Sequence, residues 1–187
     1  MHRLFSLVFL FAGMPSHAQE IQDPHQQVLT IPVSVGALDL IDLDIELKVP
    51  GGLQGDLLVL GAIEQDKILV WQVLANGPTK MIHFQASTGD LLFQQNVPSE
   101  AIEGAQPSRT STRLVGGGRV AVLGPQEVRM IGLGGELLEV FELPFKSSDI
   151  LGASSEALFI SSAQTPEPDS PTFFRLDLAT GQVQGAP

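Results

Sequence analysis

Two arginines, Arg109 and Arg113, are the residues whose placement most directly suggests binding chemistry. The chain of 187 residues has 10 lysines and arginines against 21 aspartates and glutamates, which gives a formal net charge of −11. Both arginines flank the stretch 99–112, whose serines, threonines, glycine and proline are typical of a loop. Because loops on a rigid scaffold commonly carry binding residues, we predict that Arg109 and Arg113 anchor an anionic group. The simpler alternative is ordinary surface charge.

The other reactive side chains do not form a recognisable catalytic set. Beyond residue 18 the histidines are His25 and His83, and the sequence has no Gly-x-Ser-x-Gly motif to present a nucleophilic serine. His83 stands in a predicted strand, where a structural imidazole is the simpler interpretation. No pair of carboxylates suited to glycoside cleavage stands out from the acidic background. We therefore predict no catalytic residue.

Two patterns that could hold a metal ion or a phosphate have structural explanations. Asp42, Asp44 and Glu46 share one face of a predicted strand, but such neighbours are roughly 6.5 to 7 Å apart, too far to share one calcium ion without bending. The glycine runs 116–118 and 132–135 do not clearly open a helix that could hold a phosphate. We predict a solvated strand face and turn glycines, with no metal site and no cofactor.

The first 18 residues, MHRLFSLVFLFAGMPSHA, predict a secretory signal peptide. They combine a basic start, an apolar run over residues 4–14 and small residues at Ser16 and Ala18. The apolar run is shorter than the roughly 20 residues that span a bilayer, which disfavours a membrane anchor. The chain has no cysteine, which suggests export to a bacterial periplasm without disulfides. We expect a secreted or periplasmic protein.

A repeat of 46 residues organises the remainder of the chain. Gly89, Gly135 and Gly181 are separated by this interval, and each follows a short apolar strand and precedes a second strand and a proline. A period of this size without helical spacing of apolar residues predicts an all-β repeat fold, in which four strands form each unit. The full repeats are 51–98, 99–144 and 145–187.

A partial N-terminal repeat, residues 19–50, precedes them, with strands predicted at 28–35, 38–42 and 45–50. The predicted domain, 19–187, is thus a β-propeller-like arrangement of about four blades of antiparallel strands. It is either a compact ring with one three-stranded blade or an incomplete propeller from a larger assembly.

The third repeat resembles the quinoprotein-like (PQQ-type) β-propeller family. Asp177, Thr180 and Gly181 fit the Asp-x-x-Thr-Gly turn of that family, Thr88 and Gly89 fit it in the first repeat, and Gly135 alone fits it in the second. The family usually has tryptophan four residues after the glycine. This chain departs from that pattern, with Phe93, Glu139 and Gly185 at those positions. The resemblance implies the propeller fold and not the quinone cofactor.

Two function classes remain. The acidic balance disfavours nucleic acid and anionic membrane surfaces as partners. The first class is an exported binding or scaffold module for a protein or small-molecule partner, in which loops 75–79, 99–112 and 165–171 lie at one end of the sheets. The alternative is an enzyme, such as a propeller hydrolase or a quinoprotein-type dehydrogenase, or a fragment of one. The lack of a catalytic set favours the first class.

Cleavage of the signal peptide gives the first testable prediction. We expect mass analysis of the exported protein to find Gln19 at or near its N-terminus, because the small residues Ser16 and Ala18 fit a signal peptidase site. Recovery of the full-length chain from the cytosol would contradict the prediction.

Overall fold

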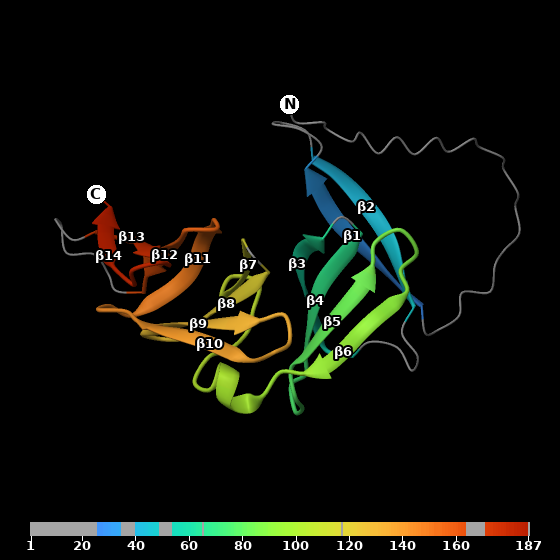
Figure 1. Cartoon of the computed structure of the whole chain (residues 1–187), viewed down its shortest axis with the longest axis horizontal. Helices are drawn as coiled ribbons and strands as arrows, with labels where there is room; N and C mark the ends of the chain where they lie inside the picture. Colours follow the sequence, from blue (N-terminus) through green and yellow to red (C-terminus); the bar gives the residue numbers. More distant parts are fainter. Residues whose placement is uncertain are drawn as a thin grey trace, which may run out of the picture.

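A computed structural model of the chain describes residues 26–34, 40–48, 54–64, 66–116, 118–163 and 171–186. These residues form an all-β structure of one two-stranded and three four-stranded antiparallel sheets, with one short 3-10 helix, η1 (Ser99–Ile102) (Figure 1). The all-β prediction is confirmed, and each full repeat forms one four-stranded sheet. The predicted signal peptide, residues 1–18, lies outside the described residues.

Within each four-stranded sheet the strands follow one another in chain order. The first sheet contains β3 (Asp56–Glu64), β4 (Lys67–Val73), β5 (Lys80–Gln85) and β6 (Leu91–Asn96). The second contains β7 (Thr112–Val115), β8 (Arg119–Leu123), β9 (Glu127–Gly132) and β10 (Leu137–Glu142). The third contains β11 (Ser147–Ala153), β12 (Ala157–Ser162), β13 (Phe173–Asp177) and β14 (Val183–Ala186).

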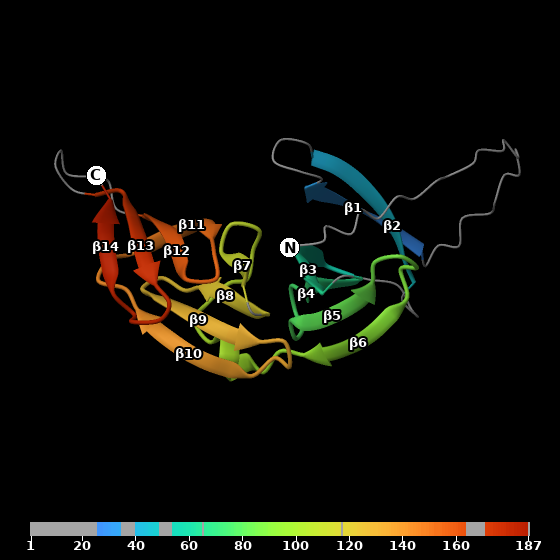
Figure 2. The ribbon, with the colours of Figure 1, turned by 45° about the horizontal axis from the view of Figure 1, so that its top comes forward.

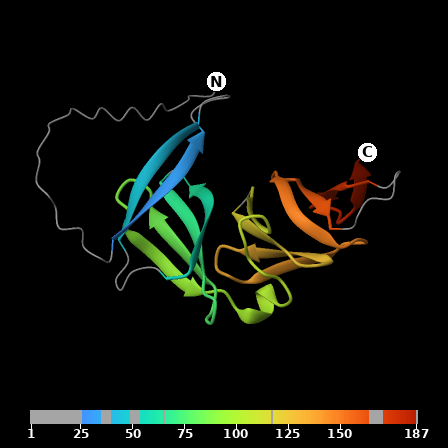
Figure 3. The same cartoon turned by 180° about the vertical axis from the view of Figure 1, so that it is seen from behind.

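The N-terminal segment differs from the sequence prediction. It forms a hairpin of two strands, β1 (Gln26–Ser34) and β2 (Leu40–Lys48), and not three. The two strands predicted at 38–42 and 45–50 are one continuous strand, because the alternation of apolar and acidic residues runs unbroken from Ile41 to Leu47. The hairpin lies beside the first sheet, on the side away from the second sheet (Figures 1 and 3).

The three four-stranded sheets stack through their faces, and their first strands lie together. β3 contacts β7, and β7 contacts β11 (Figure 2). One core cluster joins the first and second sheets, and a second joins the second and third sheets. The first includes Leu69, Trp71, Met81, Val120, Val122 and Ile131. The second includes Ala121, Met130, Phe141, Leu158, Ile160 and Leu176.

Trp71 lies in the first of these clusters with none of its surface exposed. Its strand, β4, pairs it with Met81 of β5, and both side chains pack against aliphatic side chains of the second sheet. Trp71 therefore packs between the first and second sheets. Burial of an aromatic side chain of this size contributes several kcal/mol, on the order of 3 to 5 by truncation.

The repeated glycines sit at equivalent turns, between the third and fourth strands of each sheet. Gly89, Gly135 and Gly181 all have positive φ, at 70°, 79° and 70°. A Cβ on Gly135 would lie 2.8 Å from Nε2 of Gln95, and one on Gly181 would lie 3.3 Å from Cδ1 of Phe141. Each of these two turns thus touches the last strand of the preceding sheet, and the two contacted residues are themselves 46 positions apart.

Substitution of Gly181 by alanine should therefore lower the free energy of unfolding by about 1 to 2 kcal/mol, because an L-residue is strained at positive φ and the new methyl presses on Phe141. Gly152→Ala is the matched control, since Gly152 lies in β11 and its Cβ would meet only Cδ2 of Phe159 at 3.8 Å. Chemical denaturation of both variants measures the difference. Equal stability losses would contradict this role for Gly181.

Candidate functional site

The loops of each sheet divide between two ends of the molecule. At one end, the connection after the second strand of a sheet meets the connection that leads into the next sheet. Backbone hydrogen bonds join them, from Val97 N to Thr79 O at 2.8 Å and from Ser147 N to Pro125 O at 2.9 Å. Loops 75–79 and 99–112 therefore lie at this end, which we call the loop end. Most of the third predicted loop, 165–171, lies outside the described residues.

A shallow depression of about 380 Å³ opens at the loop end. It lies where the long loop 103–111 meets the short loop 124–126 and the start of β11. Its lining is mostly hydroxyl-bearing and glycine residues: Gly104, Gln106, Ser108, Thr110, Ser111, Leu123, Gly124, Pro125, Ser147 and Ser148. None of these lining residues carries a formal charge.

The hydroxyl groups on one wall hold the long loop in shape. Ser111 Oγ donates to Gln106 O at 2.7 Å and accepts from Ser108 N at 2.9 Å. Ser108 Oγ in turn accepts from Ser111 N at 3.1 Å. This reciprocal pair closes a tight turn before β7, so the wall is fixed before any ligand arrives. On the opposite wall, Ser147 Oγ donates to Gly124 O at 2.6 Å and ties β11 to the short loop.

The two predicted anchors, Arg109 and Arg113, occupy different positions. Arg109 is exposed, and its neighbours Ser108 and Thr110 both line the depression. Arg113 is half-buried in β7, and its Nη1 donates to the backbone oxygens of Arg109 and of Thr112, the latter at 2.8 Å. Neither arginine is among the lining residues, so the structure places Arg109 beside the rim and gives Arg113 contacts that support the turn.

The full set of lining residues could not be predicted from the sequence. The long loop was identified, but Pro125, Ser147 and Ser148 were not predicted to line a site, and they come from the short loop 124–126 and from the start of β11. A usable signal was present, because serine and threonine are concentrated at the starts of the first strands β7 and β11, at residues 108–112 and 147–148. Such residues favour local hydrogen bonds with the backbone over extension of a sheet.

His83 and the acidic row lie away from this depression. His83 is in β5, and its ring centroid is 5.1 Å from that of Phe93 in the neighbouring strand. Asp42, Asp44 and Glu46 lie in β2, in register with Pro32, Thr30 and Val28. Among the described residues, no group of three or more histidine, aspartate and glutamate side chains could hold a metal ion.

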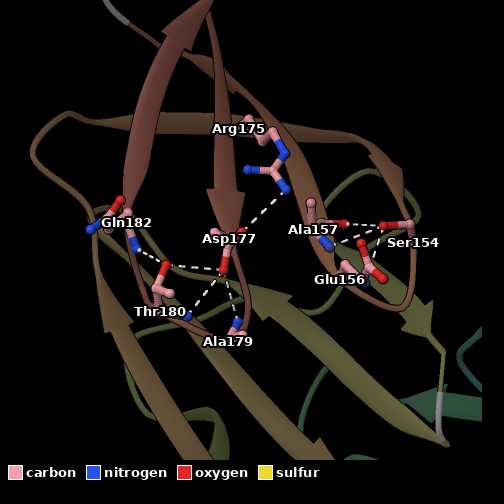
Figure 4. A network of polar contacts seen from close by, with 8 residues as sticks. All are labelled: Ser154, Glu156, Ala157, Arg175, Asp177, Ala179, Thr180 and Gln182. Carbon is pink, nitrogen blue, oxygen red and sulfur yellow. Dashed lines mark hydrogen bonds and ion pairs between the residues drawn. The ribbon is translucent and has the colours of Figure 1, made fainter.

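The opposite end of the sheets is closed by turns that a carboxylate stabilises. Asp177 Oδ1 accepts from the hydroxyl and backbone N–H of Thr180, both at 3.0 Å, and from Ala179 N at 3.1 Å (Figure 4). Asp177 Oδ2 pairs with Arg175 Nη2 at 3.2 Å. These contacts, the Thr180 hydroxyl first, hold the pKa of Asp177 below its ordinary value of 3.8.

In the first sheet, the turn between the third and fourth strands is stabilised by a carboxylate that comes from a different turn. The position equivalent to Asp177 is Gln85, and Asp66, between β3 and β4, accepts from Ser87 N at 2.8 Å and Ser87 Oγ at 2.7 Å. Gln85 Nε2 also donates to Asp66, at 3.0 Å. The Ser87 hydroxyl and then the Gln85 amide hold the pKa of Asp66 below 3.8.

Asp177 therefore gives a pH-dependent contribution to stability. Because its pKa is lower in the folded state, the contribution is complete above the ordinary value of 3.8 and is lost as pH falls through the folded pKa. Asp177→Asn should be less stable than the wild type at neutral pH, and the difference should shrink in acid. Thermal melts over this range, with Thr180→Val as the partner in a double-mutant cycle, measure the coupling. A difference that is independent of pH would contradict it.

None of the described residues belongs to a helix that is long and apolar enough to cross a membrane. No family model and no curated protein matches the sequence. Among solved structures, the chain is similar to a member of the DUF4221 family from Bacteroides vulgatus, with 11% identity, a TM-score of 0.48 and coverage of 86% of this chain and 48% of that one.

The chain is also similar to two enzymes of known structure. One is a luciferin-regenerating enzyme, with 14% identity, a TM-score of 0.43 and coverage of 79% of this chain and 50% of that one. The other is a prolyl endopeptidase, with 16% identity, a TM-score of 0.45 and coverage of 81% of this chain and 21% of that one. The chain spans half or less of the length of each of the three structures.

Proposed function

We propose that the chain is an exported β-propeller-like module that binds a segment of a partner protein at its loop end. In this proposal the three four-stranded sheets are blades, and their first strands, β3, β7 and β11, are the inner strands. The equivalent positions of Gly89, Gly135 and Gly181 support this arrangement, as do the contacts of β3 with β7 and of β7 with β11. Export rests on the predicted signal peptide.

The observation that carries the proposed function is the uncharged, hydroxyl-lined depression. Its described lining holds no titratable side chain, so the serine hydroxyls have no neighbouring base among these residues to activate them. Hydroxyl groups and loop backbone can instead exchange hydrogen bonds with the amide groups of an extended peptide. The depression is open and shallow, which suits a peptide segment better than an enclosed small molecule.

Arg109 adds a charged contact at the rim. Its side chain is exposed in an otherwise acidic protein, and its loop is held by the Ser108–Ser111 pair and by the Arg113 guanidinium. An acidic residue in the bound segment would pair with Arg109. In this arrangement Arg113 is a positioning residue, because its guanidinium contacts the loop backbone.

Peptide binding to a variant whose depression is filled by a large side chain tests the proposal. Peptides selected from a displayed random library on the purified protein should bind Thr110→Trp at least about tenfold more weakly, since the exposed Thr110 lines the depression and an indole there fills it. Thr88→Trp is the matched control, because Thr88 is exposed at the opposite end. Affinity is measured by fluorescence anisotropy with labelled peptides.

Arg109→Ala should lower the affinity for selected peptides that contain carboxylates and leave the affinity for the other selected peptides unchanged. Two results would overturn the proposal: failure of the library to yield any peptide that binds, or selected peptides that bind Thr110→Trp as well as the wild type.

A further inference from the structure

The third sheet leaves one face uncovered. Leu151, Phe159 and Phe173 have 53%, 46% and 48% of their surface exposed. Phe159 lies opposite Arg175 and Phe173 lies opposite Ser161 in the strand register, so the two phenylalanines share one face of the β12–β13 pair. We call this face, with Leu151 of β11, the terminal face. The alternate residues of these strands, such as Ile160 and Leu176, are buried against the second sheet.

The equivalent positions in the other two sheets are covered. The strands can be aligned on the backbone donor that closes each glycine turn, which is Gln85, Gly132 or Asp177. Phe173 then corresponds to Met81 and Val128, and the strand register makes Phe159 correspond to Leu69 and Ala121. All four of these side chains have 0% of their surface exposed. Each pair is covered by the aliphatic face of the next sheet, through residues such as Val122 or Ile160. The terminal face is thus built like two internal interfaces, but no described residue covers it.

We propose that the terminal face is the interface of a symmetric dimer, covered by the same face of a second copy of this chain. Two identical apolar patches can cover each other about a twofold axis, which is the commonest symmetry of protein dimers. Sheets that pack face to face at about 10 Å would bury both phenylalanines of each copy. Such an interface continues the sheet stacking that already joins the three sheets within the chain.

The distribution of charge favours this face over other contacts between copies. The chain has a formal net charge of −11, so two copies repel each other over most of their surfaces. On the terminal face, Arg175 and Asp177 neutralise each other through an ion pair of 3.2 Å. Asp149 lies beside Ser161, whose Oγ accepts from the Asp149 backbone N–H at 3.2 Å.

The oligomeric state of the purified protein tests the proposal. Sedimentation over a series of concentrations should show a monomer–dimer equilibrium, and Phe159→Ser and Phe173→Ser should each raise the dissociation constant by about tenfold or more. Leu138→Ser is the control, because Leu138 is equally exposed, at 48%, but lies on β10 of the second sheet. Circular dichroism confirms that each variant is folded.

A second measurement does not depend on loss of the phenylalanines. The chain has no cysteine, so Gln184→Cys, on the exposed last strand of the third sheet, creates a single thiol. A short bismaleimide should link Gln184→Cys into a covalent dimer and leave Gln94→Cys, the matched exposed position in β6, as monomer.

Three results would overturn the dimer proposal. They are a monomer at every concentration, a dimer that Leu138→Ser weakens as much as the phenylalanine variants, and equal cross-linking of the two cysteine variants. None of these results bears on the depression at the loop end, which lies on other residues.

Discussion

The contact on which the stacking of the three sheets depends is the close approach of the second and third glycine turns, each to the sheet before it. At Gly135 and Gly181 the backbone has positive φ and lies against the last strand of the preceding sheet. Without a Cβ the turn can move close enough for the two sheet faces to meet near the spacing of about 10 Å that side-chain packing requires. Positive φ and the lack of room for a Cβ are thus required at the same residue. This double requirement explains why glycine recurs at an interval of 46 residues.

This stacking leaves the two ends of the sheets with different chemistry. At the end opposite the loop end, the carboxylate oxygens of Asp66 and Asp177 accept hydrogen bonds from nearby backbone N–H and hydroxyl groups. These two carboxylates therefore stabilise turns. At the loop end, the chain that leaves one sheet must reach the first strand of the next, and the connection 97–111 is longer than 143–146. The extra length of the first connection forms one wall of the depression. The depression therefore lies where the repeat is least regular.

Much of the fold could be predicted from the sequence, because its signals are local. The three repeats of four strands, at 51–98, 99–144 and 145–187, were predicted from the 46-residue interval and apolar spacing, and each forms one four-stranded sheet. The N-terminal hairpin was predicted wrongly, because the strands placed at 38–42 and 45–50 are one continuous strand, β2. The second glycine turn also differs from the others. It closes from Gly132 N to Glu136 O, one residue shorter than the turn from Asp177 N to Gln182 O.

The candidate site could be predicted only in part, because it depends on contacts between distant segments. The loop 99–112 was identified from its composition, but Ser147 on the opposite wall is the first residue of β11, and nothing in the local sequence indicates that it meets this loop. Likewise, the sequence could not reveal that Asp66 replaces the missing turn carboxylate at Gln85, since the two residues are 19 positions apart and meet only across the edge of a sheet. The same limit applies to the terminal face. Phe159 and Phe173 occupy alternate positions in their strands, as apolar residues do in any strand with one buried face. Only the folded sheets show that the equivalent residues Leu69 and Met81 are buried, whereas these two phenylalanines are exposed.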